Sequence, residues 1–178
     1  LRMMNSRTYL APHDPKRKMH LVMDASPCGI ATSLYQEDDQ PKWVPVDHTS
    51  RALSAYEQGW DSQIDWESLA KVWGMMMFWP SMIGVHFTSW GDHKPLLPLY
   101  NEMSKAAPVR VARHRNKVQD LRFTDKYLPG KSMPCDYTSR HAAPIEDLTE
   151  EERRWLMVDV AEDIQVMRVI MTRATRTS

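Results

Sequence analysis

The chain has 178 residues, a length that suits one domain, and 23 basic side chains balance 23 acidic ones. Its 42% hydrophobic and 26% charged content is typical of globular proteins. No apolar run is long enough for a membrane span, and the first ten residues lack the apolar stretch of a signal peptide. Two cysteines, Cys28 and Cys135, form no CxxC pair and no disulfide framework, so we expect a reducing compartment.

Charge is unevenly distributed although the net charge is zero. The charged residues of 94–131 are mostly basic, and those of 146–163 are mostly acidic. The basic stretch makes a nucleic-acid partner a candidate, while solvated helix faces are the alternative interpretation of both stretches. The chain also lacks an initiator Met, which suggests a piece of a longer polypeptide.

Three short strands are expected first, over residues 18–24, 29–35 and 43–49, because each is rich in strand-forming residues and is bounded by turn residues. Pro45 lacks a backbone N–H and therefore predicts that the third strand lies at an edge of the sheet. Ser54, followed three residues later by Glu57, has the pattern of a capping box and begins a helix expected over much of 55–78.

The second half alternates helices and strands. We expect a strand over 85–90, a basic helix over 109–121, a strand over 122–128 and a short helix within 133–140. A three-stranded antiparallel meander followed by right-handed crossovers predicts an α/β fold: a mixed five-stranded sheet, three antiparallel strands then two parallel ones, flanked by helices.

Four acids stand at informative places. Asp24 and Asp92 each end an apolar strand, Glu67 lies on the long helix, and Asp136 lies near the start of the last helix. Neighbouring parallel strands would bring Asp24 and Asp92 to one sheet edge. Clustered carboxylates repel one another, divalent cations relieve that repulsion, and two such ions support phosphodiester cleavage. Taken singly, each acid has the alternative of a turn or capping residue.

Several segments resemble, in order, the ribonuclease H domain of the reverse transcriptase of gypsy-like (Metaviridae) LTR retrotransposons. Residues 21–30 resemble the first-strand motif, and residues 49–57 the entry to the first helix. Residues 67–73 are similar to the E-x-L-A-x-V-W motif, and residues 92–96 to T-D-H-K-P-L. The stretch 113–131 ends in a similar Y-x-P-G-K, and 136–140 resembles the closing D-x-L-S-R.

This resemblance implies a ribonuclease H-like fold and hydrolysis of the RNA strand of RNA–DNA hybrids during reverse transcription. It implies two Mg²⁺ ions, with Mn²⁺ as a substitute, and a catalytic, metal-binding quartet formed by Asp24, Glu67, Asp92 and Asp136. We hypothesise that Asp24 is shared by both ions, that Glu67 and Asp92 complete one site and Asp136 the other, and that water is the nucleophile.

The resemblance also implies a Pol polyprotein with adjoining polymerase and integrase regions. Residues 1–17 would then be a linker from the polymerase, 18–142 the ribonuclease H-like domain, and 143–178 a tail or linker towards the integrase. The expected location is a virus-like particle in the cytoplasm, with the nucleus as the alternative. No membrane partner is expected.

Contacts to the hybrid are expected to be sequence-independent, through groove shape, phosphates and 2′-hydroxyls, and to weaken with salt. A solvated helix face is the alternative for the basic residues of 109–121. The candidate nucleic-acid-binding residues are Ser26, His93, Lys94, Arg110, Arg113, Lys117 and Arg140.

The match has departures. Gly91 replaces Thr before the third acid, Tyr137 and Thr138 replace a small residue and Leu after the fourth, and residues 129–135 contain no His. A catalytically silent module with a structural or nucleic-acid-binding role is therefore the alternative function. An integrase core is disfavoured because Glu102 follows Asp92 too closely and Glu146 lies beyond the sheet.

Overall fold

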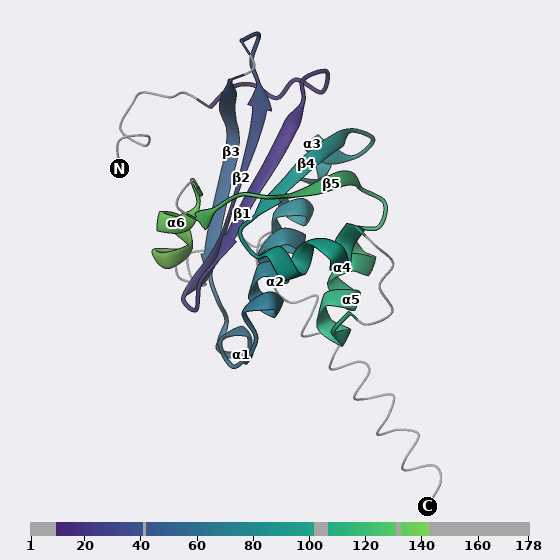
Figure 1. Cartoon of the computed structure of the whole chain (residues 1–178). Helices are drawn as coiled ribbons and strands as arrows, with labels where there is room; N and C mark the ends of the chain where they lie inside the picture. The colour runs from purple at the N-terminus through teal and green to yellow at the C-terminus, as the bar shows by residue number, and fades with distance from the viewer. Residues whose placement is uncertain (1–9, 41, 102–106, 131–132, 143–178) are drawn as a thin grey trace, which may run out of the picture.

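The computed structural model describes residues 10–40, 42–100, 107–130 and 133–142, together with the backbone alone of Asn101. Of the predicted linker 1–17, residues 1–9 lie outside the described residues, as does the whole predicted tail 143–178. Five strands form one sheet in the order β3-β2-β1-β4-β5 (Figure 1). The first three pair antiparallel, and β4 pairs parallel with β1 and β5, as predicted. The strands are β1 Met19–Ala25, β2 Gly29–Glu37, β3 Trp43–Ala52, β4 His86–Gly91 and β5 Arg122–Tyr127.

The edge position predicted for the third strand is confirmed, since β3 pairs on one side only. Pro45 lies opposite Tyr35, next to a register shift between Leu34 and Tyr35. Residues before β1 lie along this edge: the Ala11 N–H donates to the Pro45 carbonyl at 2.8 Å, and the Gln36 side chain donates to the Pro12 carbonyl at 2.9 Å. The boundary at residue 17/18 stays a prediction.

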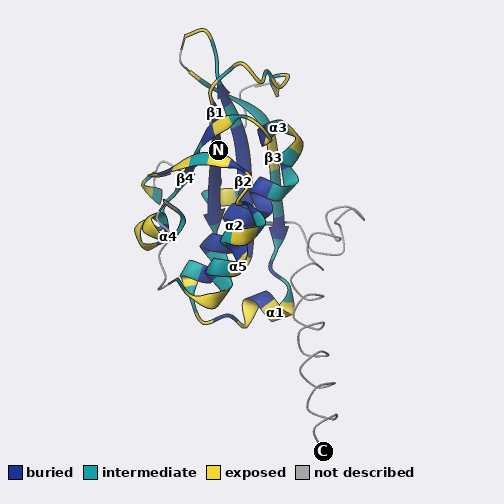
Figure 2. Cartoon of the chain, turned by 90° about the vertical axis from the view of Figure 1, so that its right-hand side faces the viewer, coloured by how far each residue is buried: buried dark blue, intermediate teal, exposed yellow. Residues whose placement is uncertain are grey.

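Helices cover both faces of the sheet. The longest, α2, packs on β1 and β2, and α5 packs on α2 (Figures 1 and 2), whereas α6 contacts β1, β2 and β3 from the other side (Figure 1). None of the described helices is long and apolar enough to cross a membrane. The helices are α1 Ala55–Gln58, α2 Gln63–Met77, α3 Trp79–Met82, the 3₁₀ turn η1 Lys94–Leu96, α4 Leu97–Asn101, α5 Val109–Lys117 and α6 Asp136–Arg140.

The single helix expected over 55–78 is wrong in one respect, because the chain leaves the helix between α1 and α2. The capping box is present: Ser54 accepts from the Glu57 N–H, and the Glu57 carboxylate accepts from the Ser54 N–H. The Trp66 indole N–H donates to the Glu57 carbonyl at 2.7 Å. The Glu57 carbonyl, in the last turn of α1, therefore accepts a tertiary contact as well as the Trp60 N–H at 3.2 Å.

Alternating residues of β1 divide the core. Leu21 and Met23 belong to the large cluster formed with α2, while Val22 packs with Met133 and Cys135 beneath α6. Both of these β1 faces are buried (Figure 2). The end of β1 that carries Asp24 is therefore held between two packed layers, which restricts how far its backbone can shift.

Candidate metal-binding site

Three of the four predicted acids come together at one edge of the sheet. Asp24 lies at the end of β1, and Asp92 directly follows β4, the parallel neighbour of β1. Glu67, on the second turn of α2, reaches the same point. One carboxylate oxygen from each residue lies within 4.8 Å of the others. The predicted apposition of Asp24 and Asp92 is thus present.

Burial makes this cluster electrostatically costly. Glu67 is 1% exposed and Asp24 is 5% exposed. Loss of solvation, together with the charges of Asp92 and Asp24, raises the pKa of Glu67 to about 9. Loss of solvation likewise raises the pKa of Asp24 to about 6, although a hydrogen bond from Ser139 opposes the rise. Within the described parts of the chain, none of the three carboxylates forms an ion pair with Lys or Arg.

The donor set suits a divalent cation. All three groups offer carboxylate oxygens, the ligands that Mg²⁺ and Ca²⁺ prefer. Glu67 Oε1 is buried and has no hydrogen-bond partner among the described residues, and a buried acceptor of this kind is costly unless something binds it. These residues therefore fit a divalent cation that would neutralise the cluster and satisfy the Glu67 oxygen.

The fourth acid stands apart. Asp136 begins α6, its side chain is 48% exposed, and it is not part of the 4.8 Å group. Its Oδ1 accepts from Arg140 Nε at 3.1 Å and from Nη2 at 2.9 Å. Its charge still contributes to the raised pKa of Asp24, so the two carboxyl groups are neighbours. The structure brings three predicted ligands together and pairs the fourth with an arginine.

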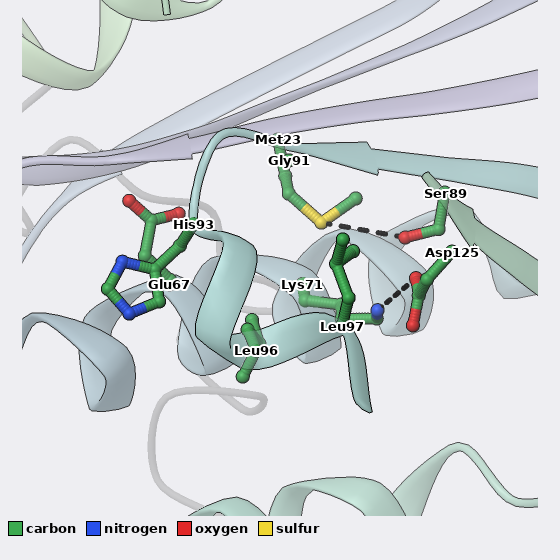
Figure 3. Close-up of a pocket in the computed structure, with 9 residues that line it drawn as sticks. All are labelled: Met23, Glu67, Lys71, Ser89, Gly91, His93, Leu96, Leu97 and Asp125. Atoms are coloured by element: carbon green, nitrogen blue, oxygen red, sulfur yellow. Dashed lines mark hydrogen bonds and ion pairs between the residues drawn. The ribbon is translucent and has the colours of Figure 1, made fainter. Parts of the chain in front are cut away.

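A small pocket adjoins the cluster (Figure 3). His93 and Glu67 lie at one end of it, and the buried ion pair of Lys71 with Asp125 lies at the other. Met23, Ser89, Gly91, Leu96 and Leu97 complete the lining. The loop after β5 closes on the cluster from another side: a Cβ at Gly130 would lie 3.0 Å from Asp92 Oδ2. Glycine permits that close approach.

The predicted nucleic-acid-binding residues fall into two groups. His93 and Lys94 directly follow Asp92, and Ser26 and Arg140 lie near Asp24. Arg110, Arg113 and Lys117 lie on α5, beyond α2. Their roles stay predictions.

Several of these side chains already have partners within the fold, Arg140 with Asp136 among them. Arg110 pairs with Asp65 and lies 4.1 Å from the Trp60 ring centroid. The buried hydroxyl of Ser26 bonds to backbone groups of Gly29 and Ser139.

Sequence reasoning missed Ser139, Gly130 and the pair of Lys71 with Asp125. Ser139 follows Asp136 by three residues, a spacing that brings two residues to one side of a helix and was the available signal. Nothing in the sequence shows that its hydroxyl meets Asp24, which lies 115 residues earlier.

Comparison with known proteins decides the family. A sequence model of the "RNase H-like domain found in reverse transcriptase" matches residues 14–121. The chain belongs to this family. The Pol polyprotein from transposon 412 of Drosophila melanogaster is 30% identical over 124 residues, which is 70% of this chain and 10% of that protein. The chain thus spans about a tenth of that relative's length.

Solved structures agree on the fold. The protease–reverse transcriptase of prototype foamy virus aligns with a TM-score of 0.55 at 12% identity, over 84% of this chain and 19% of that one. The foamy viral enzyme in complex with RNA/DNA hybrid aligns with a TM-score of 0.51 at 14% identity, over the same shares. The ribonuclease H-like fold and the reverse transcriptase family are confirmed, while the gypsy-like subclass stays a prediction.

Proposed function

We propose that this domain hydrolyses the RNA strand of RNA–DNA hybrids during reverse transcription and that Asp24, Glu67, Asp92 and Asp136 hold the divalent cations it needs. The observation that carries the proposal is the cluster of Asp24, Glu67 and Asp92, of which Asp24 and Glu67 are buried, and which has no lysine or arginine counter-ion in the described structure. A second support is that the foamy viral relative has been solved with an RNA/DNA hybrid.

The chain's own residues divide the work. Asp24 would be shared between two sites, with Glu67 and Asp92 completing one and Asp136 the other. When bound, two Mg²⁺ ions, or Mn²⁺ in their place, supply activation of water and stabilisation of the leaving oxygen. The packed ends of β1, β4 and α2 fix three ligands before any ion arrives, which lowers the cost of assembling the site. Asp136 would need to exchange its contact with Arg140.

Binding of the hybrid would use cations around the cluster. Lys94 is exposed, and its Nζ lies 4.6 Å from the centroid of the Tyr127 ring. Arg113 is exposed on α5, and Lys117 is partly exposed on the same helix. These side chains, together with Ser26, His93, Arg110 and Arg140, would contact phosphates and 2′-hydroxyls rather than base edges.

The setting proposed for this activity is a Pol polyprotein of a gypsy-like element, next to polymerase and integrase regions, in a cytoplasmic or nuclear virus-like particle. The 30% identity to a transposon Pol polyprotein supports that setting.

The test is cleavage of a labelled RNA–DNA hybrid in Mg²⁺ by the full chain, compared with Asp24→Asn and with Asp61→Asn, an exposed control. We expect the parent and Asp61→Asn to cut RNA only within the hybrid, and Asp24→Asn to lose at least a hundredfold in rate, since it removes a ligand that both sites share. Unimpaired cleavage by Asp24→Asn would contradict the proposal.

The alternative is a silent module that binds the hybrid without cutting it, and the position of Asp136 outside the cluster favours it. It predicts hybrid binding without cleavage by the folded parent in Mg²⁺ and in Mn²⁺. The same assay therefore separates the two functions.

A further inference from the structure

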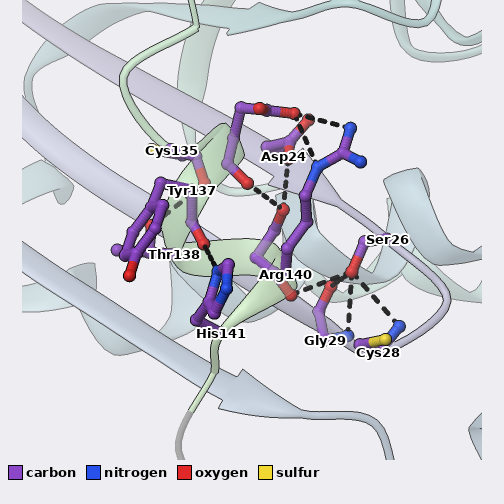
Figure 4. A network of polar contacts seen from close by, with 11 residues as sticks. Asp24, Ser26, Cys28, Gly29, Cys135, Tyr137, Thr138, Arg140 and His141 are labelled. Carbon is purple, nitrogen blue, oxygen red and sulfur yellow. Dashed lines mark hydrogen bonds and ion pairs between the residues drawn. The ribbon is translucent and has the colours of Figure 1, made fainter. Parts of the chain in front are cut away.

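A network of polar contacts joins α6 to the end of β1 (Figure 4). Ser139 is fully buried, and its hydroxyl donates to Oδ2 of Asp24, the acid placed at the centre of the cluster. The same hydroxyl lies 3.0 Å from the Asp136 carbonyl, within its own helix. Ser139 thus contacts one acid of the quartet by its side chain and lies one turn from another.

The backbone of Ser139 is held independently of its side chain. Its carbonyl accepts from Ser26 Oγ at 2.8 Å, and Ser26 Oγ in turn accepts from the Gly29 N–H at 3.1 Å. A Cβ at Gly29 would lie 2.9 Å from the Ser139 carbonyl oxygen and 2.6 Å from the Ala142 Cβ. The turn between β1 and β2 therefore touches the backbone of α6, and glycine is needed for that approach.

We infer that Ser139 is a positioning residue for the metal site: its hydroxyl fixes Asp24 through Oδ2, and so sets the direction of the other oxygen, while tying the helix that carries Asp136 to the cluster. This inference rests on the proposed function. A carboxylate rotates easily about its last side-chain bond, and one donor to one oxygen removes that freedom. Partners of this kind orient metal ligands, and their loss weakens metal affinity.

Because the backbone of Ser139 contacts Ser26 and its side chain contacts Asp24, one substitution can remove the second contact and keep the first. Ser139→Ala removes the hydroxyl but keeps the carbonyl that Ser26 holds, so α6 retains its docking contact. Thr138→Val is the matched control. Thr138 lies on the same helix, and its hydroxyl donates to the Cys135 carbonyl at 3.0 Å, with no contact to Asp24. Both variants lose one side-chain hydroxyl of α6, and only one of those hydroxyls meets the cluster.

The experiment is calorimetric titration of the full chain with Mn²⁺, without nucleic acid, beside melting curves in EDTA. We expect Ser139→Ala to weaken Mn²⁺ binding by roughly 10- to 100-fold and Thr138→Val to leave it within about twofold. In cleavage assays, the Mg²⁺ concentration for half-maximal rate should rise in Ser139→Ala, while the KM for hybrid stays unchanged. A residue that only docks the helix would lower the melting temperature without moving either metal constant.

Each outcome decides the inference. Parental Mn²⁺ affinity in folded Ser139→Ala overturns it and leaves the proposed function standing. A parent chain that binds no Mn²⁺ overturns both. Should Ser139→Ala fail to fold, Ser139→Cys decides, because a thiol keeps the side chain and is only a weak donor. Its Mn²⁺ binding should be weaker than that of the parent, and an unchanged affinity would overturn the inference.

Discussion

Glu67 is almost completely buried, and its pKa of about 9 has a consequence for stability. An unfolded glutamate has a pKa of about 4.3. Between these values the folded chain keeps a proton that the unfolded chain releases, so the stability of the metal-free protein falls as pH rises through this window. Glutamine cannot ionise. In EDTA at pH 7.5 we expect Glu67→Gln to melt above the parent, on the order of 5 °C, with a flatter pH dependence.

The same substitution should remove stabilisation by metal. Ions that bind only the folded state would raise the melting temperature of the parent, and Glu67→Gln lacks one of the carboxylates proposed to hold them. Melting curves with and without Mg²⁺ measure both effects. Asp61→Asn, at an exposed position, is the control and should follow the parent in each condition. A parent that melts above Glu67→Gln in EDTA would show that burial of this carboxyl is not costly.

His20 is held as a neutral imidazole by its neighbours. Its Nδ1 accepts from the Trp90 indole N–H at 3.2 Å, so its Nε2 carries the proton and donates to Glu37 Oε1 at 3.2 Å. The His20 ring also stacks on the Trp43 ring, with the two ring centroids 4.2 Å apart. Burial lowers the pKa of His20, and Glu37 opposes that shift. Protonation at Nδ1 would place the new N–H of His20 against the indole N–H of Trp90, and two donors cannot form a hydrogen bond with each other.

We therefore expect His20 to titrate below its usual pKa of about 6.5 and to exist as the Nε2–H tautomer. Because the unfolded chain takes up this proton first as pH falls, His20 should contribute a loss of stability on acidification below that value. Long-range ¹⁵N–¹H NMR reports both properties. Glu37→Gln should lower the pKa further, since it removes the opposing charge. An Nδ1–H tautomer, or a pKa above 6.5, would contradict this account.

At the scale of elements, α2 lies close against β2. A Cβ at Gly74 would lie 2.3 Å from Thr32 Cγ2 and 2.6 Å from Thr32 Oγ1. Alanine normally stabilises a helix by about 1 kcal/mol relative to glycine. Here the overlap should outweigh that gain, and we expect Gly74→Ala to lower the free energy of unfolding by roughly 1–3 kcal/mol in urea titrations.

Shortening the opposing side chain should rescue this variant. Thr32→Ala in the Gly74→Ala background is expected to recover part of the loss, a non-additive result typical of residues in contact. Gly59→Ala is the control, because its nearest neighbour, the Tyr56 carbonyl oxygen, would lie at 3.4 Å. If Gly59→Ala and Gly74→Ala lowered the free energy of unfolding equally, the close contact of α2 with β2 would not be the cause of the loss at Gly74.

Features that depend on local sequence were predictable. The capping box at Ser54 and the edge position of Pro45 follow from short-range patterns, and the pairing of three antiparallel strands followed by two parallel ones follows from the order of the elements along the chain. The break between α1 and α2 follows Gly59, the C-cap of α1, and the contact of the Trp66 indole with the Glu57 carbonyl is one that no periodicity reveals. Likewise, the pair of Asp136 with Arg140 has the four-residue spacing of helical ion pairs and was open to prediction, whereas the bond of Ser139 to Asp24 spans the fold.

At the scale of the whole molecule, a formal net charge of zero gives no long-range attraction to a polyanion, so the proposed binding of a hybrid would rest on local cations. Two arginines of α5 differ in exposure, so their substitution should affect hybrid binding and folding stability to different extents. Arg113 is exposed, while Arg110 pairs with Asp65 and lies over Trp60. We expect Arg113→Ala to reduce the slope of log affinity against log salt by about 1.

Arg110→Ala should act mainly on the stability of the fold. It leaves Asp65, which is 7% exposed, without its partner, so the melting temperature should fall by several degrees. Fluorescence anisotropy with a labelled hybrid across a KCl series, in EDTA to prevent cleavage, measures the slopes, and thermal denaturation measures the stability. If Arg113→Ala kept the parental slope while Arg110→Ala lowered it without loss of stability, the phosphate contact would belong to Arg110. The hybrid would then have to displace Asp65 in order to bind.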